Sequence, residues 1–273
     1  DDTVIVYHTP TYAKTILLLK KLKKFKMILE VEEVFYENEK LKNREKIKKI
    51  EDNAFSGCKS FTLVNIPESV TRIELAVFSN CKTIESIDIP ENVTSIGASA
   101  FSGCINLKSI VIPNKVESIG KQAFASCEGL TSVYISGSVK RIDEYAFDWC
   151  KNLQDLTLCE GIESIGNGAF SWCKIESVVL PNTLTTLGNY AFSSNNIKSI
   201  VLPSSLTSIG NGAFYNNNIT ALHCKATTPP TAGGDFLSSN PTIYLKIYVP
   251  AGSVEAYKAA AFWKIYADKI VAE

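Results

Sequence analysis

Eight cysteines are the residues of this chain whose spacing most suggests chemistry. Six of them recur three residues after a phenylalanine, at Cys58, Cys81, Cys104, Cys127, Cys150 and Cys173. A zinc site needs ligands that converge on one tetrahedral centre, usually from CxxC pairs, whereas two thiols form a disulfide when their Cα atoms lie close together. Single thiols at a constant interval do not converge, so the interval itself must be explained first.

The interval belongs to an internal repeat that organises most of the chain. Its phenylalanines are Phe55, Phe78, Phe101, Phe124, Phe147 and Phe170 at a spacing of 23 residues, and then Phe192, Phe214 and Phe236 at a spacing of 22. Within the unit 101–124 the apolar positions are Leu107, Ile110, Ile112, Val116 and Ile119. Pro113 follows Ile112, and Gly120 follows Ile119. The alternation over 107–112 predicts a short strand, which the proline ends.

A single unit is too small to fold alone. About six buried apolar side chains contribute roughly 1.5–3 kcal/mol each, or about 10–20 kcal/mol for the whole unit. This total is less than the cost in ordering entropy, which is roughly 1.5 kcal/mol for every residue of the unit. Stacked units bury both faces of every coil and depend on their neighbours. The sequence therefore predicts a solenoid over 47–250, with a parallel sheet built from one short strand per coil of 22–23 residues.

The repeated motif LxxIxIPxxVxxIGxxAFxxC resembles the BspA-type leucine-rich repeat of bacterial surface proteins. The resemblance implies a leucine-rich repeat solenoid that is not an enzyme and that binds or adheres to a protein. It also implies a secreted or cell-surface location and, as partner, a host extracellular matrix or cell-surface protein. It does not indicate which ligand is bound or which oligomer forms.

In a solenoid the six repeat cysteines form a ladder along the molecule. Asn195 and Asn217 occupy the same place in the next two coils, and a small polar side chain that contacts turn backbone would explain this exchange. We therefore expect buried free thiols, while disulfides between adjacent coils stay an alternative because the Cα atoms would lie about 5 Å apart. Cys224 takes a strand core position and Cys159 replaces the proline, so neither is predicted to be catalytic.

Both ends depart from the repeat, as the terminal units of solenoids do. Residues 1–46 are predicted to form an N-terminal strand and an amphipathic capping helix. Residues 251–273 are predicted to form a helical cap that begins at Ser253 and covers the last coil. Its apolar side chains are Tyr257, Phe262, Trp263, Tyr266 and Ile270.

Composition and motif searches narrow the function classes. The chain has 28 basic and 28 acidic residues, which indicates no nucleic-acid partner, and no apolar run of the roughly 18 residues that a membrane span requires. Phosphate-loop, nucleophile-elbow, zinc-protease and calcium-loop motifs are absent from the sequence. We therefore predict no metal, cofactor or catalytic residue.

Candidate binding residues lie where the repeat varies. Each predicted strand has one outward side chain between its two inward ones, and these form a row about 4.8 Å apart. The row is Asn65, Asp88, Val111, Tyr134, Thr157, Val179, Val201, His223 and, in the capping coil, Tyr248. Soluble surfaces rarely expose such an apolar row unless it binds something.

Trp149 and Trp172 share a second variable position, two residues after the repeat phenylalanine. Two tryptophans on adjacent coils could form a hot spot for a protein or a platform for a sugar. The alternative is that they fill a convex turn locally.

Three functional interpretations follow from these patterns. A non-catalytic binding module would hold its ligand on the strand face, and a structural spacer would display another domain and bind nothing. An enzyme acting on glycans would require a pair of carboxylates that converge in a concave site. We predict the protein-binding module, with the spacer or a glycan-binding module as alternatives.

Overall fold

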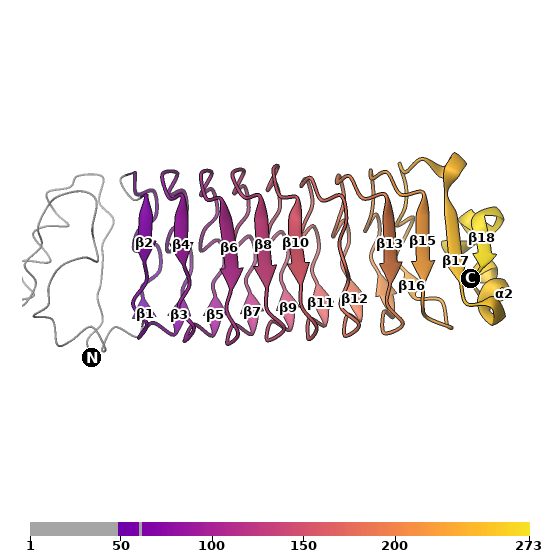
Figure 1. Cartoon of the computed structure of the whole chain (residues 1–273), viewed down its shortest axis with the longest axis horizontal. Helices are drawn as coiled ribbons and strands as arrows, with labels where there is room; N and C mark the ends of the chain where they lie inside the picture. Colours follow the sequence, from indigo (N-terminus) through magenta and orange to yellow (C-terminus); the bar gives the residue numbers. More distant parts are fainter. Residues whose placement is uncertain (1–48, 60–61) are drawn as a thin grey trace, which may run out of the picture.

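The computed structural model describes residues 49–59 and 62–273, and it shows an elongated solenoid of stacked coils with a cap at the C-terminal end (Figure 1). The predicted strand and capping helix of residues 1–46 lie outside the described residues. No helix in the described part of the chain is both long and apolar enough to cross a bilayer.

One strand of nearly every coil lies on the front face in Figure 1 and runs parallel to its neighbours. The front strands are β2 (Leu63–Asn65), β4 (Ser86–Asp88), β6 (Ser109–Ile112), β8 (Ser132–Ile135), β10 (Asp155–Leu158), β13 (Ser199–Leu202), β15 (Ala221–Cys224), β17 (Lys246–Val249) and β18 (Ile270–Ala272). They form three parallel groups, β2–β4, β6–β8–β10 and β13–β15–β17–β18. The predicted parallel solenoid is confirmed.

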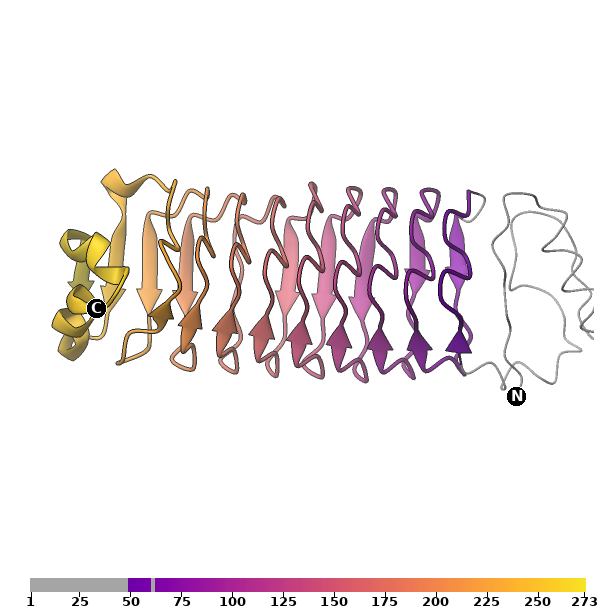
Figure 2. The ribbon, with the colours of Figure 1, turned by 180° about the vertical axis from the view of Figure 1, so that it is seen from behind.

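A second, shorter strand follows in each coil on the rear face (Figure 2). These strands are β1 (Lys49–Ile50), β3 (Arg72–Ile73), β5 (Ser95–Ile96), β7 (Ser118–Ile119), β9 (Arg141–Ile142), β11 (Ser164–Ile165), β12 (Thr186–Leu187), β14 (Ser208–Ile209) and β16 (Thr231–Ala232). They form one parallel sheet of nine described strands. Each is only two residues long, too short for the alternation that predicts a strand from sequence.

The front face contains one coil without an assigned strand, at residues 177–180. Val178 and Leu180 are buried and Val179 is exposed, so the predicted inward and outward positions are kept. This is the coil in which the repeat shortens from 23 to 22 residues, between Cys173 and Ile175. The interruption thus falls where the two coil lengths meet.

A column of stacked phenylalanines forms the centre of the core. From Phe55 to Phe214 the ring centroids of neighbouring coils lie 5.0–5.9 Å apart, with ring planes within 12° of parallel. Such pairs contribute about 0.5–1.5 kcal/mol each beyond the area they bury. The column explains why one phenylalanine recurs in every coil.

The cysteine ladder runs beside this column. The thiols of Cys81, Cys104, Cys127, Cys150 and Cys173 each donate to the phenylalanine carbonyl of the preceding coil, at 2.9–3.4 Å. The side-chain amides of Asn195, Asn217 and Asn240 donate to the equivalent carbonyls at 2.8 Å. The predicted contact with turn backbone is confirmed, and the eight cysteines are free thiols in the structure.

Asparagine performs a second task that depends on the coil length. In the longer coils the amide of Leu153, like its equivalents, donates to the carbonyl of its own coil's Cys150. In the first shorter coil the amide of Ile175 instead donates to Asn195 Oδ1 at 3.0 Å, and the next coil repeats this with Asn217. A thiol is a weak acceptor, so the change from cysteine to asparagine accompanies the loss of one residue.

The C-terminal cap closes the aromatic column. It comprises 3-10 helices at Thr242–Tyr244, Ala251–Ser253 and Trp263–Lys269, the short helix α2 (Val254–Ala259), and strand β18. Phe236 packs on Trp263 at 4.7 Å between ring centroids, and the Trp263 indole donates to the Pro230 carbonyl. Tyr257 donates to the Ala226 carbonyl in the same way. Tyr257, Trp263 and the other buried aromatic residues of the cap therefore cover the last coil, as predicted.

Ser253 is the N-cap of α2, as predicted, although its side chain makes no capping hydrogen bond. Two other details of the predicted cap are wrong. Phe262 is exposed, because it adopts the left-handed conformation, with φ of +62°, that separates α2 from the following 3-10 helix. The chain then returns to the front sheet as β18 rather than continuing as a helix.

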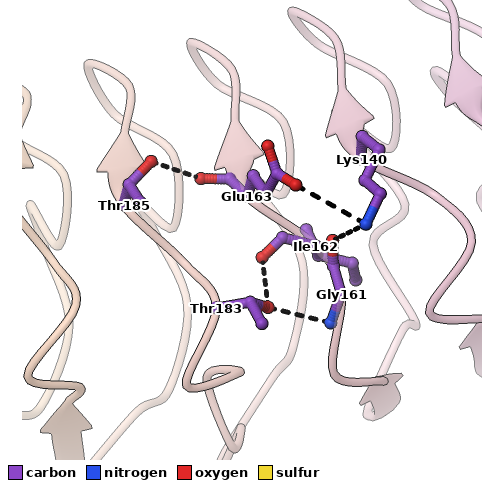
Figure 3. Close-up of polar contacts among 6 residues, drawn as sticks. All are labelled: Lys140, Gly161, Ile162, Glu163, Thr183 and Thr185. Atoms are coloured by element: carbon purple, nitrogen blue, oxygen red, sulfur yellow. Dashed lines mark hydrogen bonds and ion pairs between the residues drawn. The ribbon is translucent and has the colours of Figure 1, made fainter.

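Polar contacts join neighbouring coils just before the rear strands β9, β11 and β12 (Figure 3). Lys140 Nζ lies 3.5 Å from Glu163 Oε1 and donates to the Gly161 carbonyl at 3.3 Å. The Thr183 hydroxyl accepts from the Gly161 amide, and Thr185 donates to the Glu163 carbonyl. Both charges are more than half exposed, so the pair contributes at most about 1 kcal/mol. This part of the rear face is polar and structural.

Candidate binding surfaces

The predicted outward row lies on the front face as one continuous line. Strand pairing places Val111 beside Tyr134 and Tyr134 beside Thr157, on β6, β8 and β10. Val201 on β13 and Tyr248 on β17 lie on either side of His223. Val179 occupies the coil between the two groups, where no strand is assigned.

The row is exposed to solvent along most of its length. The exposed fractions are 83% for Val179, 61% for Val111, 47% for Val201 and 40% for Tyr134. Thr157 is also exposed and Tyr248 is half-buried. A rigid sheet therefore presents branched and aromatic side chains in a line, and their inward neighbours are buried in the core except for the half-buried Leu156.

The structure extends this row by one residue that the sequence did not predict. Val271 on β18 pairs with Tyr248 and is exposed. Its segment, Ile270–Ala272, is too short to be recognised as a strand and was predicted to be part of the helical cap.

Polar side chains flank the C-terminal end of the row. His223 stacks on Tyr248 with ring centroids 4.5 Å apart. Glu273 accepts from Lys225 Nζ at 2.9 Å and lies 3.1 Å from His223 Nδ1, and hydrogen bonds from Lys225 and then His223 hold the pKa of the Glu273 carboxyl below its ordinary value. The apolar part of the row therefore lies mainly between Val111 and Val201.

The tryptophan pair lies elsewhere, on the turns that follow the rear strands β9 and β11 (Figure 2). The rings of Trp149 and Trp172 are 5.4 Å apart and tilted by 31°, and Lys151 Nζ lies 4.9 Å from the Trp149 ring. They are 42% and 52% exposed. The structure thus separates the candidate residues into a front row and a rear pair.

Three exposed tyrosines that were not predicted from the sequence lie on the turns that follow the rear strands, here called the rear turns. Tyr145 and Tyr190 lie two residues before the repeat phenylalanine, and Tyr215 lies one residue after it. Tyr190 and Tyr215 contact each other edge to face at 6.1 Å. Aligning every variable position of the repeat, and not only the strand positions, would have found them.

A shallow groove of about 370 Å³ lies beside the C-terminal cap, with Asp235 and Asp268 in its lining. Asp235 accepts hydrogen bonds from the Tyr266 hydroxyl and the Leu237 amide. Asp268 forms an ion pair with Lys269 at 3.0 Å. Both carboxylates of this groove are thus engaged by neighbouring groups.

Comparison with known proteins agrees with the coil geometry. The model of the BspA-type leucine-rich repeat region matches residues 31–153 and 117–230, in six copies. The chain belongs to the BspA-type leucine-rich repeat family. This repeat solenoid is typically a scaffold and not an enzyme fold.

Solved structures resemble this BspA-type chain. A leucine-rich repeat protein from Bacteroides ovatus is 31% identical, with a TM-score of 0.66 over 76% of this chain and 54% of that one. The T. pallidum leucine-rich repeat protein is also 31% identical, with a TM-score of 0.46 over 55% of this chain and 66% of that one. The chain therefore spans about half of the Bacteroides protein. The comparison with curated proteins finds no match.

Proposed function

We propose that this BspA-type chain is a non-catalytic protein-binding module of the adhesion type, and that it holds its ligand on the front row. The observation that carries the proposal is the exposed line from Val111 to Val201. Leucine-rich repeats generally bind proteins, and continuous exposed apolar surface commonly marks such a site.

The energetics of the row favour a protein ligand. Fully burying a valine contributes roughly 1.5–3 kcal/mol, and Val111, Val179 and Val201 all have substantial exposed area to bury. Their backbone belongs to a stacked solenoid, so binding would order few additional groups and lose little entropy. A partner with an apolar strip of matching length would gain the most.

We also propose a secreted or cell-surface location for the protein. The family resemblance supports a secreted or cell-surface protein, and a matrix or cell-surface protein of a host as the partner.

The test measures binding of the full chain to a panel of immobilised extracellular matrix proteins. Replacing Tyr134 by Ala and Val179 by Asp should weaken saturable binding about tenfold or more, which corresponds to about 1.4 kcal/mol. A matched rear-face control replaces Lys140 and Glu163 by Ala and should bind as the unaltered protein does. Equal affinity of the front-row variant and the unaltered protein would rule out the front row as the binding site. Absence of binding to every protein of the panel would favour the structural spacer.

A further inference from the structure

Four exposed aromatic residues occupy rear-turn positions that are unfavourable for large side chains. Tyr145, Trp149, Trp172 and Tyr190 have φ of +54° to +59°, in the left-handed region. Other coils place small or polar residues there, namely Asn53, Gly57, Ala76, Asn80, Ser99, Gly103, Gln122, Ser126, Gly168, Ser194, Gly212 and Asn216. A side chain with a Cβ costs about 1–2 kcal/mol in this conformation. The fold therefore does not require these rings.

Glycines in the next coil make room for two of the rings. A Cβ on Gly168 would come within 2.6 Å of the Tyr145 ring, and a Cβ on Gly212 within 2.5 Å of the Tyr190 ring. The Cδ1–Cε1 edge of each tyrosine therefore lies against the neighbouring glycine, and the exposed area belongs to the rest of the ring. Trp149 and Trp172 lie on consecutive coils with ring centroids 5.4 Å apart, so these two rings pack against each other and expose their remaining surface.

Side-chain amides border the rings. Asn167 and Asn189 accept hydrogen bonds at Oδ1 from the backbone amides of the following coils, which fixes their orientation. Asn211 Nδ2 donates to the Tyr190 hydroxyl at 3.2 Å, so this asparagine row contacts the aromatic surface directly. Amides and phenols offer both donors and acceptors.

Most charges around this surface are engaged by neighbouring groups, and Lys174 beside Trp172 donates to Asn152 Oδ1 rather than to a carboxylate. Lys151 lies over Trp149 and also 3.0 Å from Glu128 Oε1, and Lys121 lies 3.1 Å from Glu144 Oε2. A nucleic acid or another polyanion would need uncompensated cations along its path. A protein hot spot would need a pocket that encloses an anchor side chain, whereas these rings lie on exposed turns. The surroundings thus favour a neutral, flat ligand with hydroxyl groups at its edge.

We propose that the rear turns from Tyr145 to Tyr215 bind a neutral carbohydrate chain. A pyranose ring has an apolar C–H face that can stack on an aromatic ring, and hydroxyls at its edge that can bond to the amides. The sugars would lie against the exposed surfaces of Trp149, Trp172 and Tyr190, along the solenoid axis. This surface is separate from the front row, so it neither requires nor excludes a protein ligand there.

The experiment is affinity electrophoresis of the full chain through gels that contain one neutral polysaccharide each: a β-glucan, a xylan, a mannan or an arabinogalactan. At least one should retard the protein, and about 0.5 M salt should not abolish the retardation, because screening weakens only ionic contacts. The same polysaccharide should shield tryptophan fluorescence from a soluble quencher, since Trp149 and Trp172 are exposed and Trp263 is buried.

The decisive variant replaces Trp149 and Trp172 by Gly, which the same position carries at Gly57 and Gly103. Glycine suits the left-handed backbone, so the variant should fold while its affinity for the polysaccharide falls about tenfold or more. The front-row variant, Tyr134→Ala with Val179→Asp, should bind the polysaccharide normally.

Three results would overturn the carbohydrate site: no retardation in any of the four gels, retention of binding in the double glycine variant, or binding that salt abolishes. Loss of matrix-protein binding in the glycine variant, without any polysaccharide binding, would also overturn it and would assign the rings to a protein. Each result leaves the separate front-row test unaffected.

Discussion

At the scale of single residues, one carbonyl per coil decides what occupies the ladder position. The carbonyl of Phe101, like its equivalents, lies inside the core and accepts the backbone amide of Cys104, and the ladder side chain of the next coil provides a second donor. A thiol and an amide both provide the donor, as Cys127 and Asn217 show. Cysteine in this repeat is thus a small apolar residue with one weak donor, and its regular spacing reflects stacking rather than metal or redox chemistry.

Exposure and thiol pKa should separate the cysteines in a labelling experiment. Cys58 and Cys159 are partly exposed, and the interaction with the neighbouring Cys81 thiol lowers the pKa of the Cys58 thiol. Because the thiolate is the nucleophile, we expect a thiol reagent to modify Cys58 first and Cys159 more slowly in the folded protein at neutral pH. The measurement is mass spectrometry of peptides over time. Early modification of Cys127 or Cys150 would contradict the buried ladder.

At the scale of the coil, repeat length and side-chain type change together. The shorter coil lacks one residue between the ladder cysteine and the next strand. The amide of Ile175 therefore does not bond to the ladder carbonyl of its own coil, and it donates to Asn195 of the next coil instead. The shorter coils therefore depend on the following coil for a bond that the longer coils make internally. This is a local rule that links two neighbouring units.

Replacing Asn195 by Cys tests this rule. The thiol could still donate to the Phe170 carbonyl, but it would leave the amide of Ile175 without a good acceptor. We expect the free energy of unfolding to fall by about 1–3 kcal/mol in a urea titration. The adjacent Asn196 is exposed, and replacing it by Ala should change stability by less than about 0.5 kcal/mol. Equal stability of the two variants would refute the rule.

At the scale of the whole molecule, the ladder couples stability to alkaline pH. Burial raises the pKa of Cys104 to about 12 and also raises the pKa values of Cys127, Cys150 and Cys173. An unfolded thiol has a pKa of about 8.5. Above that pH the unfolded chain loses protons that the folded chain keeps, so the stabilisation present at neutral pH declines as the pH rises.

Thermal unfolding between about pH 7 and pH 10 should therefore show a falling midpoint from about pH 8.5 upward. A variant with Cys104, Cys127 and Cys150 replaced by Ser has hydroxyl donors in place of the thiols and lacks these titrating groups. Its midpoint should fall less over the same range. Parallel curves for the two proteins would mean that other groups cause the alkaline loss.

The amino-acid sequence alone predicts the solenoid, the coil length, the inward and outward positions of the front strands and the contact of the ladder side chains with backbone. These features repeat in every unit, so the phenylalanine spacing and the pattern of Leu107, Ile110 and Ile112 carry the same signal many times. The periodicity also places Val111, Tyr134 and Val201 in one line, because parallel strands in register bring equivalent residues side by side.

Features that depend on contacts between coils become visible only in the folded molecule. The rear strands are two residues long and exist because neighbouring coils pair with them. The strand β18 completes the front sheet from a segment that reads as a helical cap. The left-handed φ of Trp149 and Tyr190, and the support of Tyr190 by Gly212, depend on backbone geometry and on the next coil. Side-chain type along the chain does not encode these contacts, so the rear aromatic surface emerges only when the coils are stacked.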